Sequence, residues 1–434
     1  MKYIKENKKT YFDVIGIILS FFYLFSTYLA GSIYFPSFLN RVALLAFLAY
    51  GVYTMVKKII NGTFHLSICS IWYCAFICYT VISFPFSSRT LGFSSNHFYE
   101  MVVCFFITLF ISEFVTTEKT FNYICWAYVL SSFILVFLLY KNGDLTGDYN
   151  ERLGNEVSGN ANVFATFIMY SVIYGLWLLM CQDYRPSVKV FLCLNILLNL
   201  YALMLSAGRK FFVIPFSFLY ILLLLKSKNR ASKSIVKYTV IMLVIVCIVY
   251  IIITQVPPIY NAIGIRMEQL INSITGKGTV DASSLIRSQM RKAAINEWVK
   301  KPLFGFGFDT FKYLQTADYI GLNIYSHCNY TELLYSGGLV YTSIYYFFFI
   351  YLIYKAFKTR ESKRTHCAFA IAVVISQLIL DYGGVFYDVA ITQIILLLAA
   401  KTIELPKTEN DKVEDKDRRC EYGKYFHNHQ FAKE

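Results

Sequence analysis

The chain has 434 residues, of which 57% are hydrophobic and only 16% are charged. A soluble domain carries about 25% charged residues, so this composition excludes an ordinary soluble globular protein. The formal net charge of +14 raises the question of a nucleic-acid partner. The lysines and arginines cluster between apolar runs, however, and no nucleic-acid motif is present, so we expect no nucleic acid among the partners.

Apolar runs follow one another along most of the chain. About 20 apolar residues cross the ~30 Å of a bilayer core as a helix, which satisfies its own backbone polar groups in lipid. The runs therefore predict an all-α, polytopic membrane protein with about twelve transmembrane helices in one domain, residues 1–401. The predicted spans are 12–33, 38–56, 64–84, 98–115, 121–140, 161–181, 187–205, 211–225, 235–256, 329–355, 366–381 and 385–401. Residues 402–434 are charged and predict a disordered tail.

The positive-inside rule orients these spans. Lysines and arginines are frequent before the first span and in every second connection, such as 226–237 and 355–364, and scarce in the other short connections. This bias predicts that both termini, and with them the tail, are cytoplasmic. The long segment 257–328 is then exterior.

The eleven cysteines lie mostly inside apolar runs and show no CxxC pair or Cys/His ligand spacing. We therefore expect no disulfide framework, no metal and no cofactor. Buried thiols acting as small apolar side chains account for these residues.

The long exterior loop contains one predicted helix, about 285–300. Ser283 or Ser284 can cap its start, and Pro302 follows its end. Arg287 and Arg291 stand one turn apart on a shared face of this helix. They are either an ordinary solvated pair or part of an anion site.

Two further groups of polar residues lie at predicted exterior ends of the spans. Arg209 and Lys210 occupy a very short exterior turn, where they either reach lipid headgroups or hold an anionic ligand. His327 precedes the tenth span and is followed by Asn329 and Glu332. A histidine at a helix start is either a capping or packing residue or a proton acceptor.

The order of these motifs resembles the O-antigen polymerase and O-antigen ligase superfamily. The resemblance covers roughly residues 150–345. The matching residues are Arg152, Asn160 and Asn162 before and within GNANVFATF, Arg209 in LSAGRK, Arg287 before PLFGFG, and His327 with Glu332 in HCNYTELL. The chain has Cys328 where the family often has asparagine after the histidine, and Asn329 follows one place later.

The resemblance implies a metal-independent glycosyltransferase of the GT-C type with an undecaprenyl-diphosphate-linked sugar as donor. Arginine forks bind phosphate oxygens bidentately, so Arg209 and Arg287 are the predicted diphosphate ligands, with Lys210 and Arg291 beside them. His327 is the predicted catalytic base. Arg152, Asn162, Asn329 and Glu332 are predicted to bind substrate or to support the site.

Three functions remain open on the sequence. The leading one is a polymerase of surface polysaccharide (O-antigen, capsule or exopolysaccharide), which moves a growing lipid-linked glycan onto a lipid-linked repeat unit. The second is a ligase that moves finished glycan to a lipid core or a protein, and the third is a polysaccharide exporter or flippase. Each places the protein in the bacterial cytoplasmic membrane among membrane lipid. A polymerase would work with a flippase and a chain-length regulator of the same pathway.

Overall fold

The computed structural model describes residues 13–30, 32–86, 95–145, 152–227, 231–275, 282–314 and 325–405. Within these ranges the chain forms helices and no strand, which confirms the all-α prediction. The elements are α1 (Val14–Ala30), α2 (Ser37–Ile60), α3 (Ile68–Ser83), η1 (Phe84–Phe86), α4 (Asn96–Phe114), α5 (Glu118–Lys141), α6 (Asn155–Ser158), α7 (Ala161–Cys181), α8 (Pro186–Leu205), α9 (Arg209–Lys226), α10 (Ala231–Gln255), α11 (Pro257–Ile259), η3 (Tyr260–Gly264), α12 (Ile265–Thr275), α13 (Ala282–Trp298), η4 (Phe311–Tyr313), α14 (Asn329–Thr359), α15 (Arg364–Asp381) and α16 (Ala390–Glu404).

Each predicted span falls on one of these helices. Nine helical segments of the described chain are long and apolar enough to cross a membrane. The three other predicted spans correspond to α1, α9 and α16, which are also helices but are short or carry charged ends. The protein is therefore an all-α polytopic membrane protein. The predicted tail lies outside the described residues from 406 onward.

Helices α7 and α15 form the centre of the bundle. In α7, 78% of the apolar stretch is buried, and in α15 72% is buried. Helix α7 packs against α5, α8 and α9, and α15 packs against α9, α14 and α16. Helix α10 is the opposite case, because its apolar stretch has the highest mean hydropathy, 2.7, yet buries none of its residues. Such a helix suits a lipid-facing position at the edge of the bundle.

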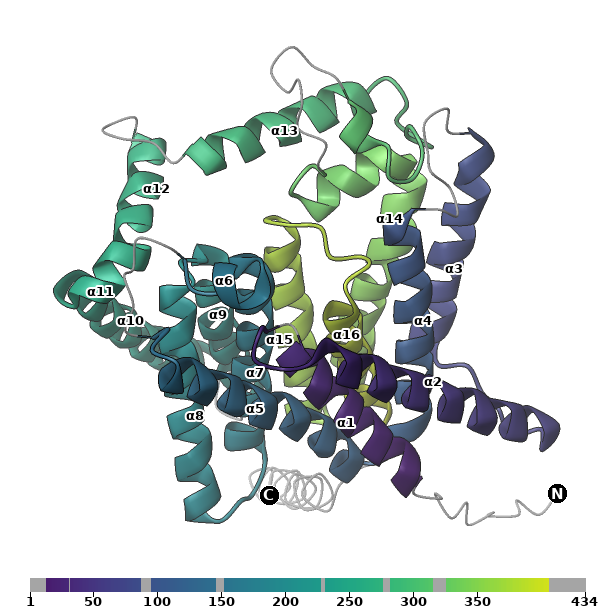
Figure 1. Ribbon diagram of the computed structural model, residues 1–434, viewed down its shortest axis with the longest axis horizontal. Coiled ribbons are helices and arrows are strands. Elements are labelled where there is room, and N and C mark those ends of the chain that lie inside the picture. Colours follow the sequence, from purple (N-terminus) through teal and green to yellow (C-terminus); the bar gives the residue numbers. More distant parts are fainter. Residues whose placement is uncertain are drawn as a thin grey trace, which may run out of the picture.

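Helices α12 and α13 lie outside the bundle proper. Figure 1 shows α12 rising beside α11 and α13 crossing the end of the bundle towards α14, against which it packs. The sequence predicts one helix in this segment, at about 285–300, and the structure has α13 there, from residue 282 to residue 298. Helix α12 is additional. Arg266 and Glu268 interrupt its short apolar pattern, which hides it from a search for spans.

The segment that follows α13 is inserted into a break in α14. Gly338 has φ 66° and ψ −162°, a backbone conformation available to glycine almost alone, and it interrupts the helix. The amides of Phe306 and Gly307 donate to the carbonyls of Tyr335 and Ser336 at 2.8 and 2.7 Å. The amide of Leu339 donates back to the carbonyl of Pro302 at 2.8 Å. The loop therefore fixes α13 on α14.

A substitution at Gly305 tests the insertion of this loop into the break of α14. A Cβ at Gly305 would lie 2.5 Å from the carbonyl oxygen of Tyr335, which belongs to the backbone and has no room to move. Gly305→Ala should cost about 1–3 kcal/mol for the overlap in addition to about 1–2 kcal/mol for its left-handed backbone. The thermal unfolding midpoint in detergent should fall accordingly.

Gly62→Ala is the matched control for Gly305→Ala. The two glycines have φ of +64° and +65°, but a Cβ at Gly62 meets nothing within 4 Å. Only the backbone cost should appear in this variant. Equal unfolding midpoints for the two variants would contradict the close contact between the loop at Gly305 and the backbone of α14.

Candidate active site

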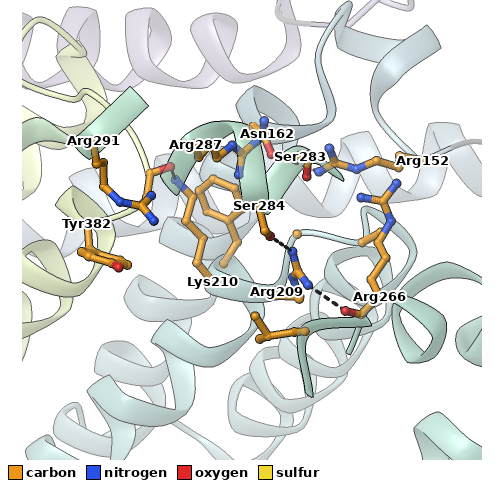
Figure 2. Close-up of a pocket in the computed structure, with 15 residues that line it drawn as sticks. Arg152, Asn162, Arg209, Lys210, Arg266, Ser283, Ser284, Arg287, Arg291 and Tyr382 are labelled. Carbon is orange, nitrogen blue, oxygen red and sulfur yellow. Dashed lines mark hydrogen bonds between the residues drawn. The ribbon is translucent and has the colours of Figure 1, made fainter. Parts of the chain in front are cut away.

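Two cavities adjoin at the end of the bundle that α13 crosses. The first has a volume of about 280 Å³ and is lined by Arg152, Arg209, Lys210, Arg266, Arg287 and Arg291, with Asn162, Ser283, Ser284 and Tyr382 among its other residues (Figure 2). None of the described residues that line it is acidic. A cavity that gathers charges of one sign concentrates ions of the other, so this one suits a multiply charged anion.

Arg209 connects three elements at the floor of this cavity. It is the first residue of α9, and its guanidinium donates to the carbonyl oxygen of Arg266 at 2.7 Å and to the hydroxyl of Ser284 at 2.9 Å. Figure 2 shows both bonds. Arg209 therefore lines the anion cavity and also holds α12 and α13 over the start of α9.

Lys210 lies between the two cavities. Its Nζ donates to the carbonyl oxygen of Gly383 at 2.5 Å and stands 4.6 and 4.8 Å from the ring centres of Phe211 and Phe386. Aromatic faces and a carbonyl oxygen attract a cation without cancelling its charge. A Cβ at Gly383 would lie 2.7 Å from the Lys210 side chain, which explains the glycine there.

Arg152 and Asn162 are hydrogen-bonded to each other. Arg152 donates to the carbonyl of Ser206 at 2.9 Å and to the side-chain oxygen of Asn162 at 3.0 Å. The side chain of Asn160 caps α7 by accepting the amide of Asn162 at 2.8 Å. The Asn-x-Asn segment thus places Asn162 on the walls of both cavities.

Helix α13 presents its two arginines to the first cavity. Arg287 and Arg291 both line it, and the Arg291 guanidinium carbon lies 4.8 Å from the ring centre of Tyr382. Met290 and Ala294, which neighbour the two arginines on the helix surface, are buried against Phe311 and Tyr335.

The second cavity has a volume of about 230 Å³ and shares five lining residues with the first, namely Asn162, Lys210, Phe211, Arg287 and Gly383. It contains His327, the predicted base, together with Tyr325, His97, Glu100 and Asp388. A ligand in the first cavity therefore lies next to His327 in the second.

His327 has φ 56°, a left-handed conformation that is uncommon for residues other than glycine. Its neighbours hold this turn: the Ser326 amide donates to a carboxylate oxygen of Glu332 at 2.8 Å, and the Ser326 hydroxyl donates to the Cys328 carbonyl at 3.1 Å. Burial, followed by the charges of Arg287, Lys210 and Arg291, lowers the pKa of His327 to about 4. The imidazole is therefore neutral at physiological pH, as a proton acceptor must be.

Glu332 and Asn329 line neither cavity. Glu332 is buried and holds the Ser326 amide. Asn329 accepts the Phe386 amide at 3.1 Å and donates to Asp381 at 3.2 Å, which fixes the connection between α15 and α16. The geometry favours the supporting role over the substrate-binding one for both residues.

Several lining residues escaped the sequence argument, namely His97, Glu100, Arg266, Tyr325 and Asp388. His97 and Glu100 lie one turn apart at the start of the fourth predicted span, which is a signal that could have been used. With Asp388 they also offer ligand atoms within 4.8 Å of one another, as a metal ion would require. The expectation of a metal-free site remains a prediction.

The sequence of the chain was compared with known protein families. Residues 194–346 match the family model for O-antigen ligase. The match covers less than half of the chain and confirms its predicted resemblance to the O-antigen polymerase and ligase superfamily, which implies a glycosyl-transferring enzyme of polysaccharide synthesis. It includes Arg209, Lys210, Arg266, Arg287, Arg291 and His327 and leaves out Arg152, Asn162, His97, Glu100 and Asp388. No curated protein matches the chain.

The depressed pKa of His327 gives a test of the paired cavities. Pyrophosphate bound to the arginines would offset the positive charge that favours the neutral imidazole, so the pKa of His327 should rise from about 4 towards its ordinary range. Titration of histidine NMR signals with and without pyrophosphate measures this shift. His65, exposed in the α2–α3 loop, should not respond to pyrophosphate. An unchanged His327 curve at saturating pyrophosphate would separate the two cavities electrostatically.

Proposed function

We propose that the protein transfers glycan from an undecaprenyl-diphosphate donor to a hydroxyl of an acceptor sugar, and that it does so as a polymerase of surface polysaccharide. The observation that carries this proposal is the pair of adjoining cavities. One gathers six cationic side chains, the other contains a neutral histidine, and Arg287 and Lys210 belong to both. Glycosyl transfer from a lipid diphosphate needs a site for the phosphate leaving group and a proton acceptor next to it.

The chemistry of the donor fits the first cavity. The bond between the anomeric carbon and the diphosphate oxygen breaks, and its electron pair remains on the diphosphate. Arg209, Arg287, Arg291 and Lys210 stabilise this developing charge, so no metal ion is required for the step. Arg152, held by Asn162, adds a further cation at the rim.

The acceptor hydroxyl attacks the anomeric carbon as the diphosphate leaves, and its proton passes to the imidazole of His327. Donor binding strengthens this base, because the diphosphate offsets the cations that depress the pKa of His327. The base therefore becomes effective when the donor is in place. Proton uptake by His327 in the empty site is correspondingly disfavoured.

The membrane holds the lipid part of the donor. The polyprenyl tail lies among the apolar helices while the diphosphate meets the arginines, in the manner of the GT-C class. The positive-inside bias supports a location in the bacterial cytoplasmic membrane, with cytoplasmic termini and the site on the exterior face. A flippase that delivers lipid-linked repeat units and a chain-length regulator are the expected partners.

A ligase is the second candidate, and the family model that matches carries that description. Donor chemistry is the same for both functions, and only the acceptor differs. A polymerase uses another lipid-linked repeat unit, whereas a ligase uses a lipid core or a protein.

The glycan of a deletion strain separates these functions. Complementation with wild type should restore the polymer ladder, whereas His327→Ala should leave single lipid-linked repeat units, because loss of a general base slows transfer by about 10²–10⁴-fold. Arg287→Lys should also impair the ladder, since a lysine cannot bind phosphate through two parallel bonds. Gel analysis of surface and lipid-linked glycan gives the result.

His65→Ala is the matched histidine control and should behave as wild type, since His65 is exposed and lies away from both cavities. A ladder retained on its lipid carrier in the deletion strain would identify a ligase. Repeat units trapped on the inner face would identify a flippase. A normal ladder with His327→Ala at normal expression would exclude His327 as the base.

The orientation has its own test. Green fluorescent protein fused after Glu434 should fluoresce, and alkaline phosphatase fused there should be inactive, because we place the carboxyl terminus in the cytoplasm. The reverse pair of results would invert every helix and move both cavities to the cytoplasmic face.

A further inference from the structure

The second cavity contains three polar side chains to which the reaction so far assigns no role. His97 and Glu100 lie one turn apart on the first turns of α4, and Asp388 lies just before α16. The Nδ1 atom of His97 bonds a carboxylate oxygen of Asp388. Asp388 is 5% exposed, and Glu100 is exposed at the cavity. All three side chains therefore face the space that also contains His327.

Helix α4 and its contacts hold these three residues in place. The carbonyl of Asp388 accepts the thiol of Cys104 at 3.1 Å, which holds it to α4. Ser95, directly before α4, donates to Asp309 at 2.8 Å, and Lys312 pairs with Asp309 at 2.6 Å. The start of α4 is thus fastened to the loop after α13. Changes at Glu100 should leave the arginines of the first cavity in place.

The charge of this group selects its ligand. The two carboxylates on this wall disfavour a diphosphate, which the arginines of the adjoining cavity attract. Carboxylate oxygens accept hydrogen bonds from hydroxyl groups, and the ring of His97, paired with Asp388, adds an N–H donor. Phe167, Phe386 and Tyr325 supply apolar ring faces in the same cavity. Polar groups that converge beside aromatic walls suit a sugar ring.

We propose that His97, Glu100 and Asp388 form the subsite for the acceptor sugar, where they bind its hydroxyls and turn one of them towards His327. The inference rests on the proposed function and adds the acceptor half of the reaction. An uncharged sugar with neighbouring hydroxyls is the class of acceptor that the subsite takes. The donor is then selected by charge and the acceptor by hydrogen bonding.

The test uses the full chain in nanodiscs. The donor is lipid-linked polymer at saturating concentration, and the acceptor is a repeat unit on a short synthetic lipid diphosphate at varied concentration. Glu100→Gln should raise the KM for this acceptor about tenfold or more, because it weakens charge-assisted hydrogen bonds. Binding of undecaprenyl diphosphate, measured separately, should equal that of wild type in Glu100→Gln and be lost in Arg287→Ala.

Glu113→Gln is the matched control on the same helix. Glu113 pairs with Lys58 at 2.5 Å at the far end of α4, so its KM should equal that of wild type. Glu100 is the primary target because it is exposed, and Asp388→Asn is the second variant. Both variants keep the shape of the side chain.

Each contrary outcome has a distinct meaning. Transfer by Glu100→Gln and Asp388→Asn with the wild-type KM would overturn the subsite alone. Loss of wild-type transfer in a chelator, restored by a divalent cation, would make the three residues a metal site and overturn the subsite as well. A wild-type protein that neither transfers glycan nor binds undecaprenyl diphosphate would remove the proposed function and the subsite with it.

Discussion

Six basic side chains converge on one cavity, and the surrounding structure must hold them there against their mutual repulsion. Backbone carbonyls do much of this. Arg152 donates to the carbonyl of Ser206, Arg209 to that of Arg266 and Lys210 to that of Gly383. Carbonyl dipoles position a cation without neutralising it, whereas an acidic partner in the lining would cancel the attraction for an anion. The lining therefore stays available for a ligand of opposite charge.

The architecture follows from this requirement. Helix α13 brings two of the cations, and the loop after it, inserted into the break of α14 at Gly338, helps to hold it at the cavity. Directly before the start of α14, His327 lies in a left-handed turn that Glu332 holds through the Ser326 amide. The break in α14 and the turn before its start thus bring the arginines of α13 and His327 to adjoining cavities. In an unbroken α14 the carbonyls of Tyr335 and Ser336 would accept bonds within the helix and would not be free for the amides of Phe306 and Gly307.

The end of the bundle is also divided by charge. Arginines line one cavity, and Asp388, Glu100 and His97 line the wall of the other, with Arg287 and Lys210 shared between them. In the proposed reaction this division separates the diphosphate of the donor from the uncharged acceptor sugar before any specific hydrogen bond forms. The lowered pKa of His327 reflects burial and the nearby cations. An anion in the first cavity would therefore change the proton affinity of His327 in the second.

Sequence alone could predict the features that depend on local composition. Apolar runs of sufficient length must be helices in lipid, so each predicted span is a helix, and the arginines of α13 follow from a helical spacing. The alternation of spans also implies that Arg152, Arg209, Arg287 and His327 share one side of the bundle. Their motifs sufficed to indicate the superfamily that the family comparison confirms.

Tertiary structure decided which of these residues meet. Asn329 and Glu332 resemble site residues in sequence, but their side chains turn into the protein to fix loops, because buried polar groups must be bonded. His97 and Asp388 are 291 positions apart in the sequence and pair because α4 packs against α16. Hydropathy and spacing act over a few turns of helix and therefore fix the elements and their sidedness. The cavities arise from contacts between distant helices, which no local pattern records.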